Sequence, residues 1–127
     1  MQGRDIKGYI QNLQKNVCND ALKQLKKVKL MKTIFIACDQ AHYYRITQEM
    51  THRNIRGFTS WQPLTGRGSK TGDPHYGTKA WPALNSAIIT VVEDHQVDDF
   101  LDFLKRLDEK TPALGLRAFV WNVEKMI

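Results

Sequence analysis

Glycines and cations alternate in one stretch of the chain in a way that could hold an anion. The stretch reads Gly66-Arg67-Gly68-Ser69-Lys70 and lies in a glycine-rich segment between two strand-like runs. Glycine allows the backbone to approach a ligand closely, and successive N–H groups in such turns form anion-binding concavities. Arg67 and Lys70 can pair with phosphate oxygens. These residues predict a site for a small anionic metabolite, although a mobile basic surface loop would carry the same pattern.

A further cation follows a glycine near the end of the chain. Arg117 comes two residues after Gly115 and could add a contact to phosphate, or could only begin a strand. The nearby run Gly68-Ser69-Lys70-Thr71 is not a P-loop, because it lacks the GxxxxGK spacing and the strand-to-helix setting of that motif. The prediction is therefore anion capture by two separate segments rather than by one nucleotide-binding motif.

Metal binding and catalysis have weaker support in the sequence. No two histidines are spaced i, i+4, and none clusters with cysteine as zinc sites require, so we expect all four to lie on the surface (His42, His52, His75 and His95). No Ser/His/Asp or Cys/His arrangement is evident, and Cys38 is expected to be a small buried residue. We predict that the protein is not an enzyme and has no metal site.

The positive charge of the chain is concentrated at its N-terminus. The net charge is +6, and residues 1–30 contribute +5 through seven Lys/Arg and two acidic residues. Residues 31–127 hold the other twelve Lys/Arg and eleven acidic residues, so their net charge is +1. A nearly neutral globular part lacks the electrostatic footprint of nucleic-acid binding. We predict no nucleic-acid partner.

Length and composition indicate one cytoplasmic domain with a helical extension before it. No apolar run approaches the ~20 residues of a membrane span, and the scattered Cys18 and Cys38 indicate a reducing compartment. Apolar residues at near-helical spacing and a lysine-rich end predict a basic amphipathic helix within residues 1–30, which could dock on a membrane or a partner. We expect instead an extension, or a mis-assigned start, that the domain over residues 31–127 does not require.

The domain itself alternates between strands and helices. Apolar and β-branched runs predict strands over residues 33–38, 58–61, 86–92 and 117–123. Pro63 is expected to stop the second strand, and Asp39 and Asp94 are expected to cap helices over about 41–53 and 95–109. The long loop then covers residues 62–81. We expect Trp61 and Trp121, which lie in strands, to pack in the core or in a subunit interface.

This β-α-β-β-α-β order predicts an α+β, ferredoxin-like domain. Two right-handed βαβ units in this order give a four-stranded antiparallel sheet with both helices on one face. The other face of the sheet is then bare, although its strands are rich in Ile, Val, Phe and Trp. An apolar face of this kind predicts that another subunit covers it.

From about Met31 to Val123 the chain resembles the PII-like superfamily of trimeric signalling proteins, which includes nitrogen regulatory protein PII. The resemblance implies a homotrimer and identifies residues 62–81 with the effector-binding T-loop. Gly66 and Gly68 match the glycines of the family's Gly-x-Gly-Arg run, and Thr59 stands where the second strand approaches the nucleotide. Thr111, Gly115 and Arg117 match parts of the family's phosphate-binding B-loop.

The chain departs from the PII pattern in several places. Two glycines and the Asp of the B-loop are missing, and no basic run follows the last strand. Tyr76 only loosely resembles the loop tyrosine that some PII proteins have uridylylated. A CutA-like metal-binding trimer and a ligand-free interaction scaffold therefore remain as alternatives.

The resemblance and the residues together predict a regulator. We expect a small anionic metabolite to bind at subunit interfaces, with the adenine nucleotides ATP, ADP and AMP as the candidates. The predicted ligand-binding residues lie in the second strand, the loop and the B-loop-like segment (Thr59, Gly66, Arg67, Gly68, Ser69, Lys70, Gly115 and Arg117). The loop over residues 62–81 would signal to a partner protein, such as a transporter or an enzyme, whose identity the sequence leaves open.

Overall fold

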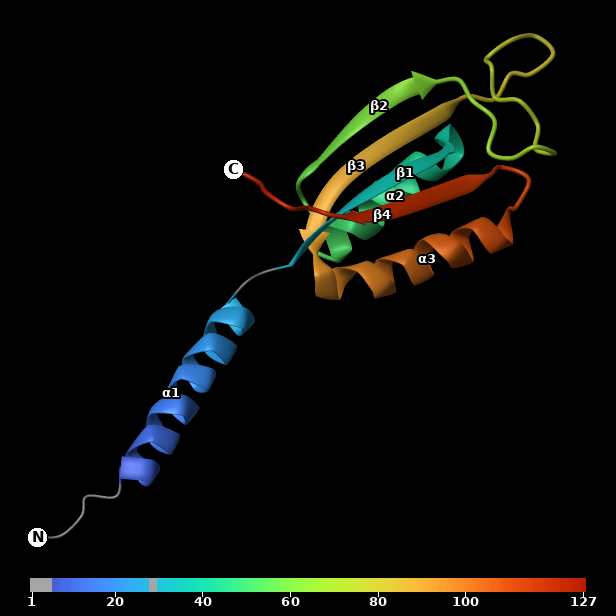
Figure 1. Ribbon diagram of the computed structural model, residues 1–127. Coiled ribbons are helices and arrows are strands. Elements are labelled where there is room, and N and C mark those ends of the chain that lie inside the picture. The colour runs from blue at the N-terminus through green and yellow to red at the C-terminus, as the bar shows by residue number, and fades with distance from the viewer. Residues whose placement is uncertain (1–5, 28–29) are drawn as a thin grey trace, which may run out of the picture.

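The computed structural model describes residues 6–27 and 30–127 and arranges them as four strands, three α-helices and one 3-10 helix (Figure 1). In chain order these are α1 (Ile6–Lys27), β1 (Met31–Asp39), α2 (Gln40–His52), β2 (Phe58–Leu64), β3 (Asn85–Glu93), η1 (Asp94–Gln96), α3 (Val97–Lys110) and β4 (Leu116–Asn122). Residues 1–5 and 28–29 of the predicted N-terminal extension lie outside the described residues.

The four strands form one antiparallel sheet in the order β2-β3-β1-β4. At its centre Phe35 of β1 stands opposite Ile89 of β3 on one side and Phe119 of β4 on the other. Side chains from both α2 and α3 join a single core with the sheet, so the two helices cover the same face. The predicted ferredoxin-like α+β fold is confirmed.

Alternation along the strands separates a buried face from an open one, because successive strand residues point to opposite sides. Ile34, Ile36 and Cys38 of β1 are buried beneath the helices. The helices contribute residues at helical spacing, which are fully or almost fully buried (Ile46 and Met50 from α2, Phe100 and Leu104 from α3). Both pairs are spaced i, i+4, as expected of residues on the buried face of a helix.

The opposite face of the sheet is open and apolar in the single chain. Trp61, Phe119 and Trp121 on this face expose 46%, 56% and 47% of their surface. Their strand neighbours in register include Ala87, Phe35 and Thr33. The expectation that these tryptophans could belong to the core is therefore wrong. The alternative expectation, a subunit interface, stays a prediction.

Two element boundaries differ from those expected. β2 continues through Pro63 to Leu64, with a shift in register after Trp61, because it is an edge strand and an edge tolerates a missing N–H donor. The start of the last helical segment is capped by Glu93 and Gln96, which form a capping box around η1, rather than by Asp94. Asp39, in contrast, caps α2 as predicted, because its side chain accepts a hydrogen bond from the Ala41 N–H.

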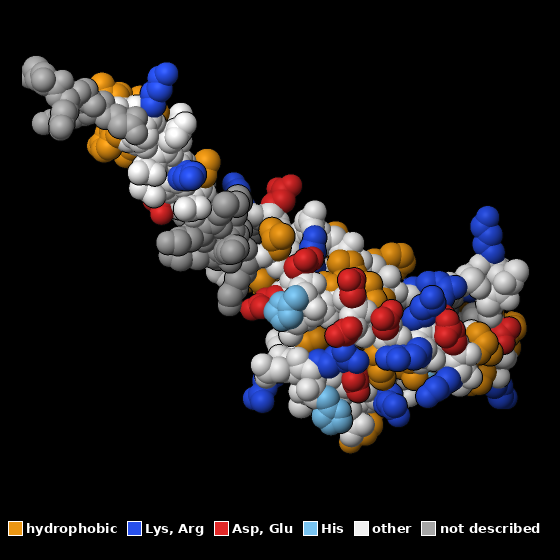
Figure 2. All heavy atoms as spheres, turned by 90° about the horizontal axis from the view of Figure 1, so that it is seen from below, with side chains coloured by type: hydrophobic (Ala, Val, Ile, Leu, Met, Phe, Trp, Pro, Cys, Tyr) orange, Lys and Arg blue, Asp and Glu red, His pale blue; other side chains and the backbone are white. Residues whose placement is uncertain are grey.

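α1 extends away from the sheet, and apolar side chains in its first part, such as those of Ile6 and Val17, are exposed. Within the described part of the chain no helix is long and apolar enough to cross a bilayer. On the face that carries α3, Figure 2 shows cationic and acidic side chains interspersed. That mixture agrees with the near-zero net charge of residues 31–127.

Candidate functional site

The long loop between β2 and β3 is divided into two parts by backbone pairing. Gly66 and His75 exchange N–H to carbonyl hydrogen bonds of 3.0 and 2.8 Å, which closes the segment between them. A further bond from the Gly77 N–H to the Ala83 carbonyl, 3.0 Å long, closes the second part. The loop predicted over residues 62–81 is thus a pair of closed turns over residues 65–84.

A tight turn between α3 and β4 meets the first part of this loop. The backbone of Gly115 has φ +74°, a conformation that other residues rarely adopt. A Cβ placed on Gly68 would lie 3.7 Å from the Gly115 Cα, so the two glycines bring the two segments into contact. Gly68 and Gly115, which belong to separate motifs in the sequence, therefore lie side by side in the fold.

A cavity of about 340 Å³ lies where these two segments meet the open face of the sheet. Its volume is in the range of small-molecule pockets. Its apolar side is formed by sheet residues (Phe35, Ala37, Ala87 and Phe119). The rest of its lining comes from the start of β3, from the end of β2 with the loop, and from the turn before β4 with the first part of that strand (Asn85 and Ser86; Leu64, Thr65, Gly66, Arg67, Gly68 and His75; Leu114, Gly115 and Arg117). Such a lining suits a molecule with an apolar or aromatic body and an anionic end.

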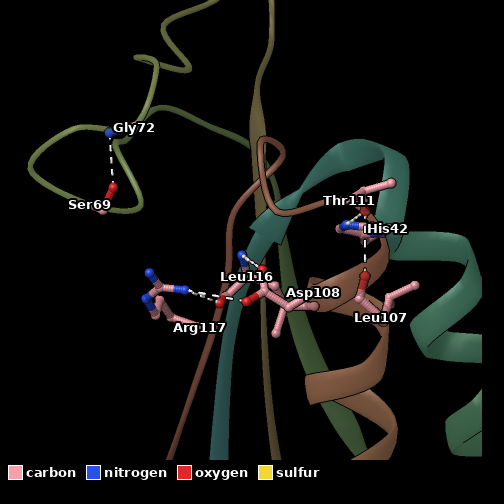
Figure 3. A network of polar contacts seen from close by, with 8 residues as sticks. All are labelled: His42, Ser69, Gly72, Leu107, Asp108, Thr111, Leu116 and Arg117. Carbon is pink, nitrogen blue, oxygen red and sulfur yellow. Dashed lines mark hydrogen bonds and ion pairs between the residues drawn. The ribbon is translucent and has the colours of Figure 1, made fainter.

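Two arginines line this cavity and differ in their partners. The Arg117 Nη1 donates to the Leu116 carbonyl at 2.7 Å and lies 3.7 Å from an Asp108 carboxylate oxygen (Figure 3). Asp108 also accepts a hydrogen bond from the Leu116 N–H, at 3.1 Å. Arg67 is exposed and has no ion pair within the described residues. Arg67 therefore offers the cavity the less compensated positive charge.

Two histidines that we expected on the surface are buried, so that expectation is wrong for them. His75 exposes 6% of its surface, and its Nδ1 lies 2.6 Å from the Asn85 Oδ1 and 3.4 Å from the Asp39 Oδ2. His42 exposes 5%, and its Nε2 lies 3.2 Å from the Thr111 hydroxyl (Figure 3). Burial lowers the pKa of His42, against smaller opposing effects of the carboxylates of Asp39 and Asp108. No motif in the sequence pointed to His75 as a lining residue.

Three of the predicted site residues do not line the cavity. Ser69 lines a smaller neighbouring hollow and its Oγ accepts the Gly72 N–H at 2.9 Å. Lys70 is exposed and lines neither hollow, and Thr59 is exposed near the start of β2, opposite Ile89. Five of the eight predicted residues thus line the cavity (Gly66, Arg67, Gly68, Gly115 and Arg117).

Cysteine and metal chemistry have no evident place at this cavity. Cys38 is buried in the core, and burial together with the Asp39 carboxylate raises the pKa of its thiol to about 12. Among the residues that the structure describes, no group of three or more His, Cys, Asp or Glu side chains could hold a metal ion. The cavity is therefore described by its two arginines and its apolar side.

Comparison with known protein families identifies the class of protein to which this fold belongs. The family model described as nitrogen regulatory protein P-II matches residues 31–127. The chain belongs to the nitrogen regulatory protein P-II family, and the resemblance inferred from the sequence is confirmed. A comparison with curated protein sequences returns no match.

Solved structures of PII-like proteins share the fold at low sequence identity. CPII from Thiomonas intermedia K12, solved with ADP and bicarbonate, is 22% identical with a TM-score of 0.60, over 74% of this chain and 86% of that one. The same CPII with ADP, AMP and bicarbonate gives a TM-score of 0.61 at 22% identity, over the same shares of the two chains. The GlnK–ATP complex of B. subtilis is 18% identical with a TM-score of 0.58, over 77% and 85%.

Proposed function

We propose that this chain is a PII-like regulatory protein that binds a small anionic metabolite, with an adenine nucleotide as the first candidate. The observation that carries the proposal is the cavity shared by Gly66–Gly68 and Gly115–Arg117, where two arginines stand beside apolar sheet residues. Arg67 and Arg117 would pair with the anionic group, and Phe35 and Phe119 would contact the body of the ligand. ADP, AMP and ATP bound to the related structures support this choice.

In this proposal the protein acts as a homotrimer and not as an enzyme. The cavity opens on the apolar face of the sheet, so a second subunit packed on that face would complete its wall. The loop over residues 62–81 would carry the signal to a partner protein, a transporter or an enzyme. Ligand binding can shift the loop only as far as the ligand prefers one of its conformations.

The proposal also covers location and the N-terminal extension. The two cysteines, Cys18 and Cys38, are free, which suits a reducing cytoplasm. The family model begins at residue 31, and α1 contributes no residue to the cavity. We therefore assign ligand binding to residues 31–127 and treat residues 1–30 as an extension that binding does not require.

Calorimetric titration with ATP, ADP and AMP, with and without Mg²⁺, tests the function. We expect about one site per subunit for at least one nucleotide. Arg67→Ala and Arg117→Ala should each weaken binding by about tenfold to a hundredfold, because a charge-assisted hydrogen bond contributes about 1.5–3 kcal/mol. Arg56→Ala is the matched control, since Arg56 is exposed and does not line the cavity.

Other outcomes of this titration would redirect the assignment. Unchanged affinity in both cavity variants would contradict the proposed site even if a nucleotide binds. Absence of heat with all three nucleotides would contradict adenine-nucleotide binding and favour a ligand-free scaffold or a metal-binding trimer.

A further inference from the structure

His75 ends the closed first part of the loop and holds it to the sheet. Its backbone is paired with Gly66 in both directions. Its side chain is almost fully buried, with Nδ1 at 2.6 Å from the Asn85 Oδ1 and 3.4 Å from the Asp39 Oδ2. Asn85 begins β3 and Asp39 ends β1, so one imidazole joins the loop to two adjacent strands.

These contacts favour the tautomer of His75 that carries its proton on Nδ1. The carboxylate of Asp39 and the side-chain carbonyl of Asn85 can only accept hydrogen bonds, so Nδ1 donates. In the neutral ring Nε2 is then an acceptor. Asp39 is itself fixed, because its other carboxylate oxygen accepts the Ala41 N–H at 2.8 Å.

The Nε2 atom of His75 is left available to a ligand. It has no hydrogen-bond partner within the described residues, and no side-chain nitrogen there is both buried and unpaired. It must therefore keep contact with solvent, and His75 lines the cavity that Arg67 and Arg117 also line. His75 also lines the smaller hollow beside Ser69. A buried ring that lines a cavity, with one nitrogen engaged and the other in contact with solvent, is suited to sensing what fills that cavity.

We propose that His75 couples occupancy of the cavity to closure of the loop, with Nδ1 holding the loop and Nε2 accepting a hydrogen bond from a hydroxyl or amino group of the ligand. This inference rests on the proposed function. In this proposal Nε2 reaches the cavity only while the Gly66–His75 pairing and the contacts to Asp39 and Asn85 are formed. A ligand that contacts Nε2 therefore binds the closed loop better than the open one, which is the condition for a switch.

Two substitutions of His75 in the full chain separate its two contacts. His75→Asn keeps an amide near the position of Nδ1 and removes the contact made by Nε2. His75→Gln places an amide near the position of Nε2 and loses the contacts made by Nδ1. His95→Asn is the matched control, because His95 is exposed on η1 and does not line the cavity.

ADP is the probe, since it offers hydroxyl and amino donors together with an anionic end. Calorimetry gives its affinity, and hydrogen exchange followed by NMR gives the protection of the amides of residues 66 and 75. In the wild type, ADP should slow exchange at both amides. His75→Asn should keep the protection seen without ADP but bind ADP about tenfold more weakly. His75→Gln should exchange about tenfold faster without ADP.

The outcomes distinguish this inference from the proposed function. If His75→Asn binds ADP as tightly as His95→Asn does, the contact through Nε2 is wrong while nucleotide binding stands. If His75→Gln exchanges at the wild-type rate, the anchoring role of Nδ1 is wrong. If ADP does not bind the wild-type chain, the choice of an adenine nucleotide is wrong and the coupling falls with it.

Discussion

At the scale of single residues, burial decides the protonation and reactivity of a side chain, which the residue type alone does not. Cys38 and Cys18 are both free thiols, yet Cys38 is 1% exposed and Cys18 is exposed on α1. A thiolate is strongly disfavoured in the apolar core, so Cys38 stays protonated where an exposed cysteine would react. The same argument applies to His42, whose burial favours the neutral ring.

The raised pKa of Cys38 predicts a loss of stability in alkali. In the unfolded chain the thiol ionises near its ordinary value of 9.0, whereas in the folded protein it resists ionisation up to about 12. The unfolded state therefore binds fewer protons between these values, and the free energy of unfolding falls as pH rises from about 9 to about 12.

Urea unfolding at several pH values between 9 and 12 measures this effect. The fall should be steeper in the wild type than in Cys38→Ala, because the variant lacks the buried thiol. Cys18→Ala is the control and should keep the wild-type slope. Identical slopes in all three proteins would show that Cys38 does not contribute.

At the scale of elements, the site depends on how two turns meet. The turn after α3 needs Gly115 in its left-handed conformation, whereas Gly68 has no such requirement and only ordinary contact space around it. A sequence displays both residues as glycine. The structure shows that Gly115 is needed for its left-handed backbone conformation, whereas Gly68 lies close to the backbone of the neighbouring turn.

Alanine substitutions at these two glycines should therefore differ. Gly115→Ala should destabilise the fold by about 1–2 kcal/mol, since a Cβ is strained in the left-handed region. Gly68→Ala should stay within about 0.5 kcal/mol, because its new Cβ would meet nothing closer than 3.7 Å. Chemical unfolding of both variants measures the difference. Equal losses would argue against a special role for the turn at Gly115.

Local sequence patterns predicted most of the helices and strands of the domain correctly. Period-2 and period-3.6 patterns placed all four strands and both helices of the sheet domain, and Asp39 was correctly identified as a cap. The end of β2 was misplaced because Pro63 stops a central strand but is tolerated at an edge, and edge position is a property of the assembled sheet. Pairing of Gly66 with His75 joins loop positions that no short-range pattern relates.

At the scale of the whole molecule, the open apolar face of the sheet predicts assembly with other subunits. Trp61, Phe119 and Trp121 lie on this face and are each about half exposed in the single chain. Large exposed apolar patches mark interaction sites, so we expect the face to be buried between subunits of a homotrimer. The cavity borders this face through Phe35 and Phe119, so assembly on this face would also enclose the proposed ligand site.

A lysine on that face should prevent assembly. Wild-type protein is expected to have the mass of a trimer by light scattering, and Trp121→Lys that of a smaller species, because the buried charge would be unpaired. Tyr44→Lys is the control, since Tyr44 is 71% exposed on the helical side. Residues 31–127 alone should also be trimeric. A monomeric wild type would overturn the prediction.

The sequence by itself determined the class of fold, the family and five of the residues that line the cavity. It could do so because strand and helix periodicity, caps and glycine-cation runs are local signals, which neighbouring residues carry together. These signals were enough to predict that the loop and the segment at Gly115 would serve one ligand.

Only the tertiary structure decided the rest of the site. It brought His75 against Asp39 and Asn85, left Lys70 and Thr59 away from the cavity, and buried two histidines that looked like surface residues. Each of these facts depends on segments far apart in the chain meeting in space. Burial and long-range contact are set by packing of the whole domain, and a single sequence contains no local pattern for them.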